Sequence, residues 1–236
     1  MATTDTTNFN LDLNELAEEA FSRCGTEMRT GYDLKTARRS LNLLTIDWAN
    51  RGINLWTIEE GSIPLTQGTA AYDLPVDTID LLEHQIRTGS SASQQDLTIS
   101  RISVSTYASI PNKNATGRPI QVWIDRKSGA TNSSSVVQVP QVYVWPTPDQ
   151  SNFYTLVYWR MRRIQDAGNG VNTQDIPFRM LPCLVSGLAY YLSLKIPEAT
   201  DRIQMLKQDY EEQWMIASSE DREKAPLRLA PREFLY

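Results

Sequence analysis

The chain has 236 residues, of which 41% are hydrophobic and 22% are charged, and its formal net charge is -5. With a mean hydropathy of -0.40, this composition is typical of a soluble globular protein of one or two domains. The acidic balance disfavours a protein that grips nucleic acid over its whole surface, because such binding needs a basic footprint. Two cysteines and one histidine are too few for the common zinc sites or for a disulfide framework.

The N-terminal segment predicts a capped amphipathic helix. Residues 1–10 are polar and lack the basic start and apolar core of a signal peptide, so we expect none, and no transmembrane segment. A helix over 12–24 has capping-box spacing at Asp12 and Glu15, and Gly25 follows it as a stop.

A second helix is predicted to begin at Asp33 and to end at Gly52, because its apolar residues recur at helical spacing. This stripe consists of Leu34, Ala37, Leu41, Leu44 and Trp48. Arg38 and Arg39 lie off the stripe, and we expect them on a solvated or inter-subunit face.

The middle of the chain, residues 53–174, alternates short β-branched and aromatic runs with turn clusters. The alternation changes phase at Ser100–Arg101, which predicts a bulge, and Pro140 within a run predicts an edge strand or a bulge. The run 153–159 is apolar on both faces, which indicates a strand covered on both sides, within a sandwich or by another subunit. We therefore predict an antiparallel β-sandwich or barrel.

Residues 176–196 are apolar on every helical face. Because such a helix is buried on all sides, we expect it to be the central helix of the core. Pro182 should kink or start this helix, and Asp175 can cap it.

The last predicted helix, over about 198–222, has one apolar face and one acidic face. The acidic face consists of Gln208, Asp209, Glu211, Glu212 and Glu220. The segment after it contains two prolines, which forbid a helix, and ends in large apolar residues. An apolar tail on a soluble chain needs a partner surface.

These elements predict an α+β fold in which a β domain is inserted into a helical one. The first helix pair must rejoin the last pair to bury its stripe, which gives a four-helix core made by both ends of the chain. We expect a discontinuous helical domain over 1–52 and 175–223, an inserted antiparallel β-sandwich or barrel over 53–174, and an extended tail over 224–236.

No residue pattern predicts catalysis. Paired carboxylates occur, such as Glu59–Glu60 and Asp77–Asp80, but closeness in the sequence does not supply the facing pair that glycoside hydrolysis needs. The GNG sequence at 168–170 lacks the lysine and hydroxyl residue of a phosphate-binding loop. We therefore predict no catalytic residue, no metal site and no cofactor, and a protein that is not an enzyme.

A basic and aromatic cluster follows the long apolar strand, and consists of Tyr158, Trp159, Arg160, Arg162 and Arg163. Such a cluster can stack on and clamp a nucleic acid strand. The favoured alternative is a strand end whose arginines pair with acidic neighbours, often across a subunit contact. One basic cluster on an acidic chain gives weak affinity for nucleic acid.

Three segments resemble the head-to-tail adaptors of short-tailed bacteriophages, of the tail tubular protein A type. They are RRSLNLLTIDWANRGINLWTIEEG at 38–61, the pattern L-x-x-G-x-x-x-Y-x-L-P at 65–75, and VYVWPTPDQSNFYTLVYWRMRRI at 142–164. The arrangement of helices, β insertion and helices is also similar, and the resemblance covers most of residues 11–222.

The resemblance implies a virion structural protein, assembled in the host cytoplasm, that forms a ring, usually dodecameric, between the portal protein and the tail nozzle. Genomic DNA would pass transiently through the ring during ejection, and no membrane is involved. The C-terminal segment would then reach the portal and the β domain the nozzle.

Candidate contact residues follow from this interpretation. Contact with the portal is expected from Leu227, Leu229, Phe234, Leu235 and Tyr236, and contact with a neighbouring subunit or the nozzle from Tyr158, Trp159, Arg160, Arg162 and Arg163. An acidic channel lining repels phosphate and lets the duplex slide, which makes Glu211 and Glu212 candidates for that lining.

Two other functions stay open. A β-sandwich tail module could bind host glycans with Trp123, Tyr143 and Trp145, because exposed aromatic rings stack on sugars, although such rings more often lie in cores or subunit contacts. A cell-wall hydrolase is the other alternative.

Overall fold

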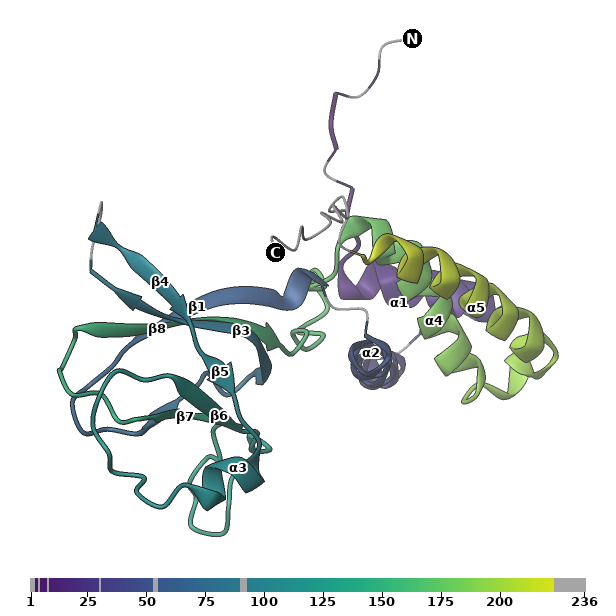
Figure 1. Ribbon diagram of the computed structural model, residues 1–236. Coiled ribbons are helices and arrows are strands. Elements are labelled where there is room, and N and C mark those ends of the chain that lie inside the picture. The colour runs from purple at the N-terminus through teal and green to yellow at the C-terminus, as the bar shows by residue number, and fades with distance from the viewer. Residues whose placement is uncertain are drawn as a thin grey trace, which may run out of the picture. The chain divides into compact units, whose positions relative to one another are not determined.

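The computed structural model describes residues 3, 5–7, 9–29, 31–52, 55–89 and 93–222. The chain divides into two compact units, a helical unit of residues 1–56 and 164–236, and a β unit of residues 57–163 (Figure 1). The α+β class predicted from the sequence is confirmed.

The helical unit is built on four α-helices that share one cluster of buried apolar side chains. They are α1 (Leu13–Cys24), α2 (Gly31–Arg51), α4 (Leu181–Ser193) and α5 (Ile203–Glu220). Short 3-10 turns lie beside them, η1 (Leu55–Thr57), η3 (Phe178–Met180) and η4 (Pro197–Arg202). The predicted last helix is therefore a 3-10 turn followed by an α-helix.

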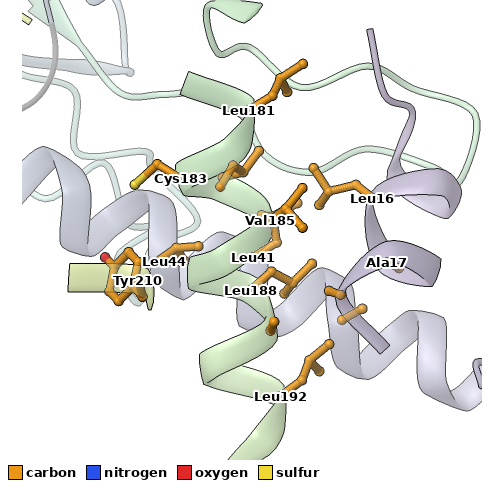
Figure 2. Packing of buried hydrophobic residues seen from close by; sticks show 14 of the residues in the cluster. Leu16, Ala17, Leu41, Leu44, Leu181, Cys183, Val185, Leu188, Leu192 and Tyr210 are labelled. Atoms are coloured by element: carbon orange, nitrogen blue, oxygen red, sulfur yellow. The ribbon is translucent and has the colours of Figure 1, made fainter. Parts of the chain in front are cut away.

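Helix α4 lies at the centre of this cluster, as its apolar sequence predicts. Ten of its thirteen residues are buried. Figure 2 shows its side chains among residues of three other helices, with Leu16 from α1, Leu44 from α2 and Tyr210 from α5. A helix surrounded in this way can be apolar on every face without exposing that surface to water.

The start of α4 differs in one respect from the sequence prediction. Pro182 is exposed in the first turn, where it starts the helix, which is one of the two outcomes predicted for it. Asp175 is not the cap, because Met180 occupies that position without a side-chain cap. The Asp175 carboxylate instead accepts a hydrogen bond from the backbone of Gln165 at 3.1 Å.

The loop before α4 belongs to the helical unit and not to the β unit. The capping box of α1 is confirmed, with both Asp12–Glu15 hydrogen bonds present. The next two backbone amides of α1, Leu13 and Asn14, donate to the carbonyls of Asn172 and Gly170. The loop thus supplies acceptors that a helix N-terminus needs. The β unit ends at residue 163, whereas the sequence predicted an end at residue 174.

The β unit contains two four-stranded sheets, in the orders β1-β8-β3-β4 and β2-β7-β6-β5. The strands are β1 (Ile58–Pro64), β2 (Ala71–Asp73), β3 (Thr78–Thr88), β4 (Gln95–Thr98), β5 (Ser100–Arg101), β6 (Gln121–Asp125), β7 (Gln141–Trp145) and β8 (Tyr154–Arg162), with the short helix α3 (Val104–Ser109) after β5. One cluster of buried side chains draws on both sheets. All pairs are antiparallel except β5 with β6, which is parallel.

The phase change near Ser100 marks a crossing between sheets, so the predicted bulge there is wrong. Strand β4 pairs with β3 in the first sheet, the next residue, Ile99, is buried, and β5 pairs with β6 in the second sheet. Register shifts occur instead within β3, between Thr78 and Asp80 and between Leu81 and Glu83.

Two other strand predictions meet different outcomes. Pro140 does not mark an edge, because it directly precedes β7, which is paired on both sides with β2 and β6. A proline is tolerated there because no ladder hydrogen bond is needed before the first strand residue. Strand β8 is covered on both faces as predicted, since the consecutive residues Leu156 and Val157 are both fully buried.

Replacement of Gly187 in α4 should destabilise the helical unit. A Cβ atom there would lie 2.9 Å from Leu44 Cδ2 and 2.9 Å from Tyr210 Cε2. Overpacking costs about 1–3 kcal/mol, whereas alanine returns up to about 1 kcal/mol of helix propensity. We expect Gly187→Ala to lower the unfolding free energy by about 1–2 kcal/mol, measured by calorimetry. Gly31→Ala is the control, because its Cβ meets nothing within 4 Å. Equal thermal midpoints of the two variants would contradict the close packing of Gly187 against Leu44 and Tyr210.

His84 should make the stability of the β unit depend on pH. It is buried in β3 with an unpartnered Nδ1, and burial, followed by the charge of Arg101, lowers its pKa despite Glu83 and a hydrogen bond with Ile99. As the pH falls through about 6.5, His84 of the unfolded chain is therefore protonated before His84 of the folded chain. The thermal midpoint of the β unit should decrease when the pH is lowered below this value.

This pH effect can be assigned, because His84 is the sole histidine of the sequence. In a His84→Gln variant the midpoint should change little between pH 7 and about 5.5, where few other side chains titrate. An equally steep fall in the variant would show that another group is responsible.

Candidate functional site

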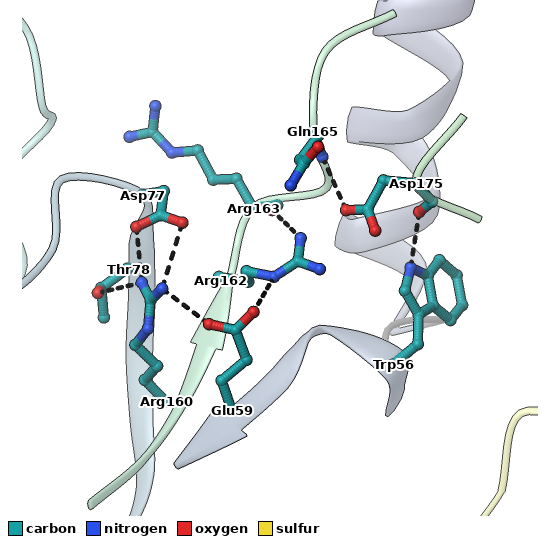
Figure 3. Close-up of polar contacts among 9 residues, drawn as sticks. All are labelled: Trp56, Glu59, Asp77, Thr78, Arg160, Arg162, Arg163, Gln165 and Asp175. Carbon is teal, nitrogen blue, oxygen red and sulfur yellow. Dashed lines mark hydrogen bonds and ion pairs between the residues drawn. The ribbon is translucent and has the colours of Figure 1, made fainter. Parts of the chain in front are cut away.

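The arginines at the end of β8 form ion pairs within the β unit (Figure 3). Arg160 donates from Nη1 to Asp77 Oδ1 at 2.6 Å and to Thr78 Oγ1 at 3.0 Å, and from Nη2 to Glu59 Oε2 at 2.8 Å. Arg162 donates from Nε to Glu59 Oε1 at 2.5 Å. The side chains of Arg160 and Arg162 are only 12% and 11% exposed, so both cations are largely withdrawn from water.

Strand alternation explains why cations are buried here. Every second residue of β8 faces the shared core, and Leu156 and Tyr158 are followed on that side by Arg160 and Arg162. A buried guanidinium is costly unless it is paired and hydrogen-bonded. Glu59 supplies the partner from β1, where it stands opposite Arg160 in the register.

The pKa values reflect this pairing. Burial raises the pKa of Asp77, but the hydrogen bonds and charge of Arg160 outweigh burial and lower it below its usual value. Burial lowers the pKa of Arg160, and its bonds to Asp77 and Glu59 more than reverse that effect. Both groups are therefore ionised at neutral pH, and the network ties β1, β3 and β8 together.

The five residues predicted to contact a neighbour differ in exposure. Tyr158 is buried, and Arg160 and Arg162 form ion pairs with carboxylates. Trp159 is half-buried, and Arg163 is exposed and donates to the Ser128 carbonyl at 2.9 Å. The subunit or nozzle contact stays a prediction, and the exposed surfaces of Trp159 and Arg163 are best suited to it.

The helical unit has its own polar contact where the chain leaves it and returns. Trp56, its last residue before the β unit, donates from Nε1 to the Asp175 carbonyl at 2.9 Å. Gln165, just after the return, donates to the Asp175 carboxylate. Within the helical unit, Asp175 thus binds both the segment that leads into the β unit and the segment that returns from it, as Figure 3 shows.

The acidic residues of α5 lie at the surface. Glu212 is exposed and accepts a hydrogen bond from Gln208 Nε2 at 3.0 Å, whereas Glu211 is half-buried. Their role in lining a channel stays a prediction. The predicted portal residues Leu227, Leu229, Phe234, Leu235 and Tyr236 lie outside the described residues.

Two of the three aromatic residues proposed for glycan binding pack against each other. Trp123 and Tyr143 are register partners on β6 and β7 with ring centroids 4.8 Å apart. Tyr107 of α3 stacks on Trp123 at 5.0 Å, and Trp145 Nε1 donates to the Asn112 carbonyl at 3.1 Å. Ring faces used in these contacts are not available to a sugar.

A groove of about 730 Å³ lies between α1 and the start of α4. Its apolar floor includes Leu181 and Val185, and its rim carries Glu15, which belongs to the capping box, and Glu19, which pairs with Arg23. The groove therefore has an apolar floor and a charged rim.

Both cysteines of the described chain are buried and free. Burial raises the pKa of Cys24 to about 11 and that of Cys183 to about 12, which keeps both thiols protonated. Among the described residues, no three histidine, cysteine, aspartate or glutamate side chains gather as a metal site. Within that same part of the chain, no helix is long and apolar enough to span a membrane.

A family model described as SU10 adaptor protein matches residues 12–230, which include nearly all of both units. The chain belongs to the SU10 adaptor protein family. It is therefore a structural adaptor protein of a bacteriophage and a component of the virion, which confirms the broader part of the resemblance. Membership favours a structural role over an enzymatic one. A search of curated proteins finds no match.

The sequence predicted acidic partners for the arginines of this adaptor but did not identify them. Glu59 and Asp77, which the sequence showed only as members of carboxylate pairs, both pair with Arg160. The available signal was that Arg160 and Arg162 continue the buried parity of β8, so that counterions had to lie nearby.

Removal of Arg160 should destabilise the β unit. The variant Arg160→Met keeps the length of the side chain but leaves Asp77 and Glu59 without their shared donor. Hydrogen bonds to charged groups are worth about 1.5–3 kcal/mol, and partial exposure of the carboxylates reduces that loss. We expect the unfolding free energy to fall by about 1–3 kcal/mol, measured with denaturant.

Arg126→Met is the matched control, because Arg126 also pairs with an aspartate but its side chain is 63% exposed. Its effect should stay below about 0.5 kcal/mol. Equal effects of the two substitutions would show that burial of the network is unimportant.

Proposed function

We propose that the protein is a head-to-tail adaptor that forms a ring between the portal and the tail nozzle, with genomic DNA passing through its lumen. The observation that carries this proposal is the family match across residues 12–230, because it includes both structural units. The dodecameric number is the one implied by the resemblance to short-tailed phage adaptors.

The division into two units supports a bridging role. A protein that joins two different partners needs two separate docking surfaces, and here the helical and β units each have their own buried cluster. We interpret the four helices as a single core and the two sheets as a sandwich. The helical unit and the tail 224–236 would engage the portal, and the β unit the nozzle.

The exposed apolar residues of the helical unit also support assembly. Leu43 and Ile46 of α2 are 53% and 57% exposed, and Met215 and Ile216 of α5 are 62% and 60% exposed. Large apolar groups that gather at a surface indicate a partner. No comparable observation favours glycan binding or cell-wall hydrolysis.

The proposal is tested by assembly with the portal protein of the same phage. The full chain should co-purify with the portal as a closed ring, which light scattering and electron microscopy would detect. Deletion of residues 224–236 should abolish portal binding without a change in the thermal midpoints. A folded full-length chain that ignores the portal but binds a glycan array would refute the proposal.

A further inference from the structure

Helix α2 presents a basic and apolar face that no described residue covers. The exposed residues Lys35, Arg39, Leu43 and Ile46 follow one another at helical spacing, with Arg38 beside them. Among the described residues, none of the three cations forms an ion pair. We call this surface the α2 face.

The charge of the α2 face extends to a neighbouring lysine. Lys195 donates from Nζ to the Ser40 hydroxyl of α2 at 2.7 Å. Burial, and then the charge of Arg39, lower the pKa of Lys195. A cation near others of the same sign is stabilised by an added carboxylate, so this surface favours an acidic partner.

Helix α5 presents a face of the opposite charge. Met205, Gln208, Glu212 and Ile216 follow one another at helical spacing, with Met215 beside them. Met205, Met215 and Ile216 are each about 60% exposed. Among the described residues Glu212 has no ion pair, and it accepts a hydrogen bond from Gln208. We call this surface the α5 face.

The two faces cannot meet within one chain, because both helices pack on α4 by their other sides. Leu44 of α2 and Tyr210 of α5 both approach Gly187 of α4. The α2 and α5 faces consist of the exposed residues on the remaining side of each helix. A complementary partner for either face must therefore come from outside the chain.

We propose that the α2 face of one copy docks on the α5 face of the next copy of this chain. The inference rests on the ring of the proposed function and names the surfaces that close it. A contact between two different faces of identical subunits is heterologous, and heterologous contacts generate rings when the rotation closes.

The spacing of the two faces supports a defined register. Arg39 and Leu43 are four residues apart, as are Glu212 and Ile216, which corresponds to about 6 Å along each helix. With the helices parallel, Arg39 lies opposite Glu212 while Leu43 lies opposite Ile216. An ion pair beside an apolar contact that excludes water is stronger than one in open solvent.

The competing position for the α5 face is the channel wall, where Glu212 would face DNA. The apolar content of this face argues against that position. Met205, Met215 and Ile216 surround the carboxylate, and a wall that lets hydrated DNA slide gains nothing from three large apolar side chains.

Cross-linking tests the contact directly. A variant with Leu43→Cys and Ile216→Cys is treated with a short bis-maleimide, both free at high concentration and bound to the portal. We expect a ladder of covalent multimers, because every copy carries both halves of the contact. The native Cys24 and Cys183 are buried, so they should react slowly.

The control for cross-linking replaces one half of the contact. A variant with Leu43→Cys and Glu18→Cys, in which Glu18 is an exposed residue of α1, should give at least ten-fold less multimer. Equal ladders would overturn the inference. If a ring forms on the portal but no ladder appears, the proposed function stands and this interface is wrong. If a ladder appears without binding to the portal, this interface stands and the proposed function is wrong.

Charge reversal provides a second test. Arg39→Glu and Glu212→Arg alone should each lower ring yield at least ten-fold, and the double variant should recover to within about three-fold of the original, because the ion pair is restored with reversed polarity. Thermal midpoints control for folding. Normal ring yield with slowed DNA ejection for Glu212→Arg would place α5 at the channel and overturn the inference.

Discussion

The burial of α4 is the constraint on which the rest of the helical unit depends. Ten of its thirteen residues are buried, so it needs apolar neighbours on every side, and three other helices supply them. Two of those helices come from the start of the chain and one from the end. Both ends must therefore fold together, and everything between them has to leave the unit and return to it.

The same requirement explains the polar contacts at the two passages. Within the helical unit, Asp175 binds Trp56 before the chain leaves and Gln165 after it returns. Within the β unit, Glu59 soon after entry pairs with Arg160 and Arg162 before exit. Each unit thus fixes both passages by its own contacts, which lets the β insertion fold without disturbing the helices.

A structural adaptor does its work through surfaces, and the distribution of side chains agrees with that role. The thiols are buried, Arg160 and Arg162 of β8 are paired, and Trp123 of β6 packs against Tyr143 of β7, so these groups serve the fold. Exposed apolar side chains lie on both units, and those of α2 and α5 are accompanied by exposed charged residues. Such groups suit contact with other proteins better than chemistry on a small molecule.

Local patterns in the sequence were sufficient for the four long helices, the capping box of α1 and the central position of 181–193, because periodicity and capping act over a few residues. They did not identify the short helix α3 or the cap of α4. They also indicated the insertion of a β unit and the adaptor family. The crossing at Ile99, the inner position of β7 and the ion pairs of Arg160 required the folded chain, since residues far apart in sequence decide them. The sequence predicted a strand at 153–159 that is covered on both faces and arginines that pair with acidic neighbours, but only the pairing of β1 and β3 with β8 brings Glu59 and Asp77 to Arg160 and Arg162.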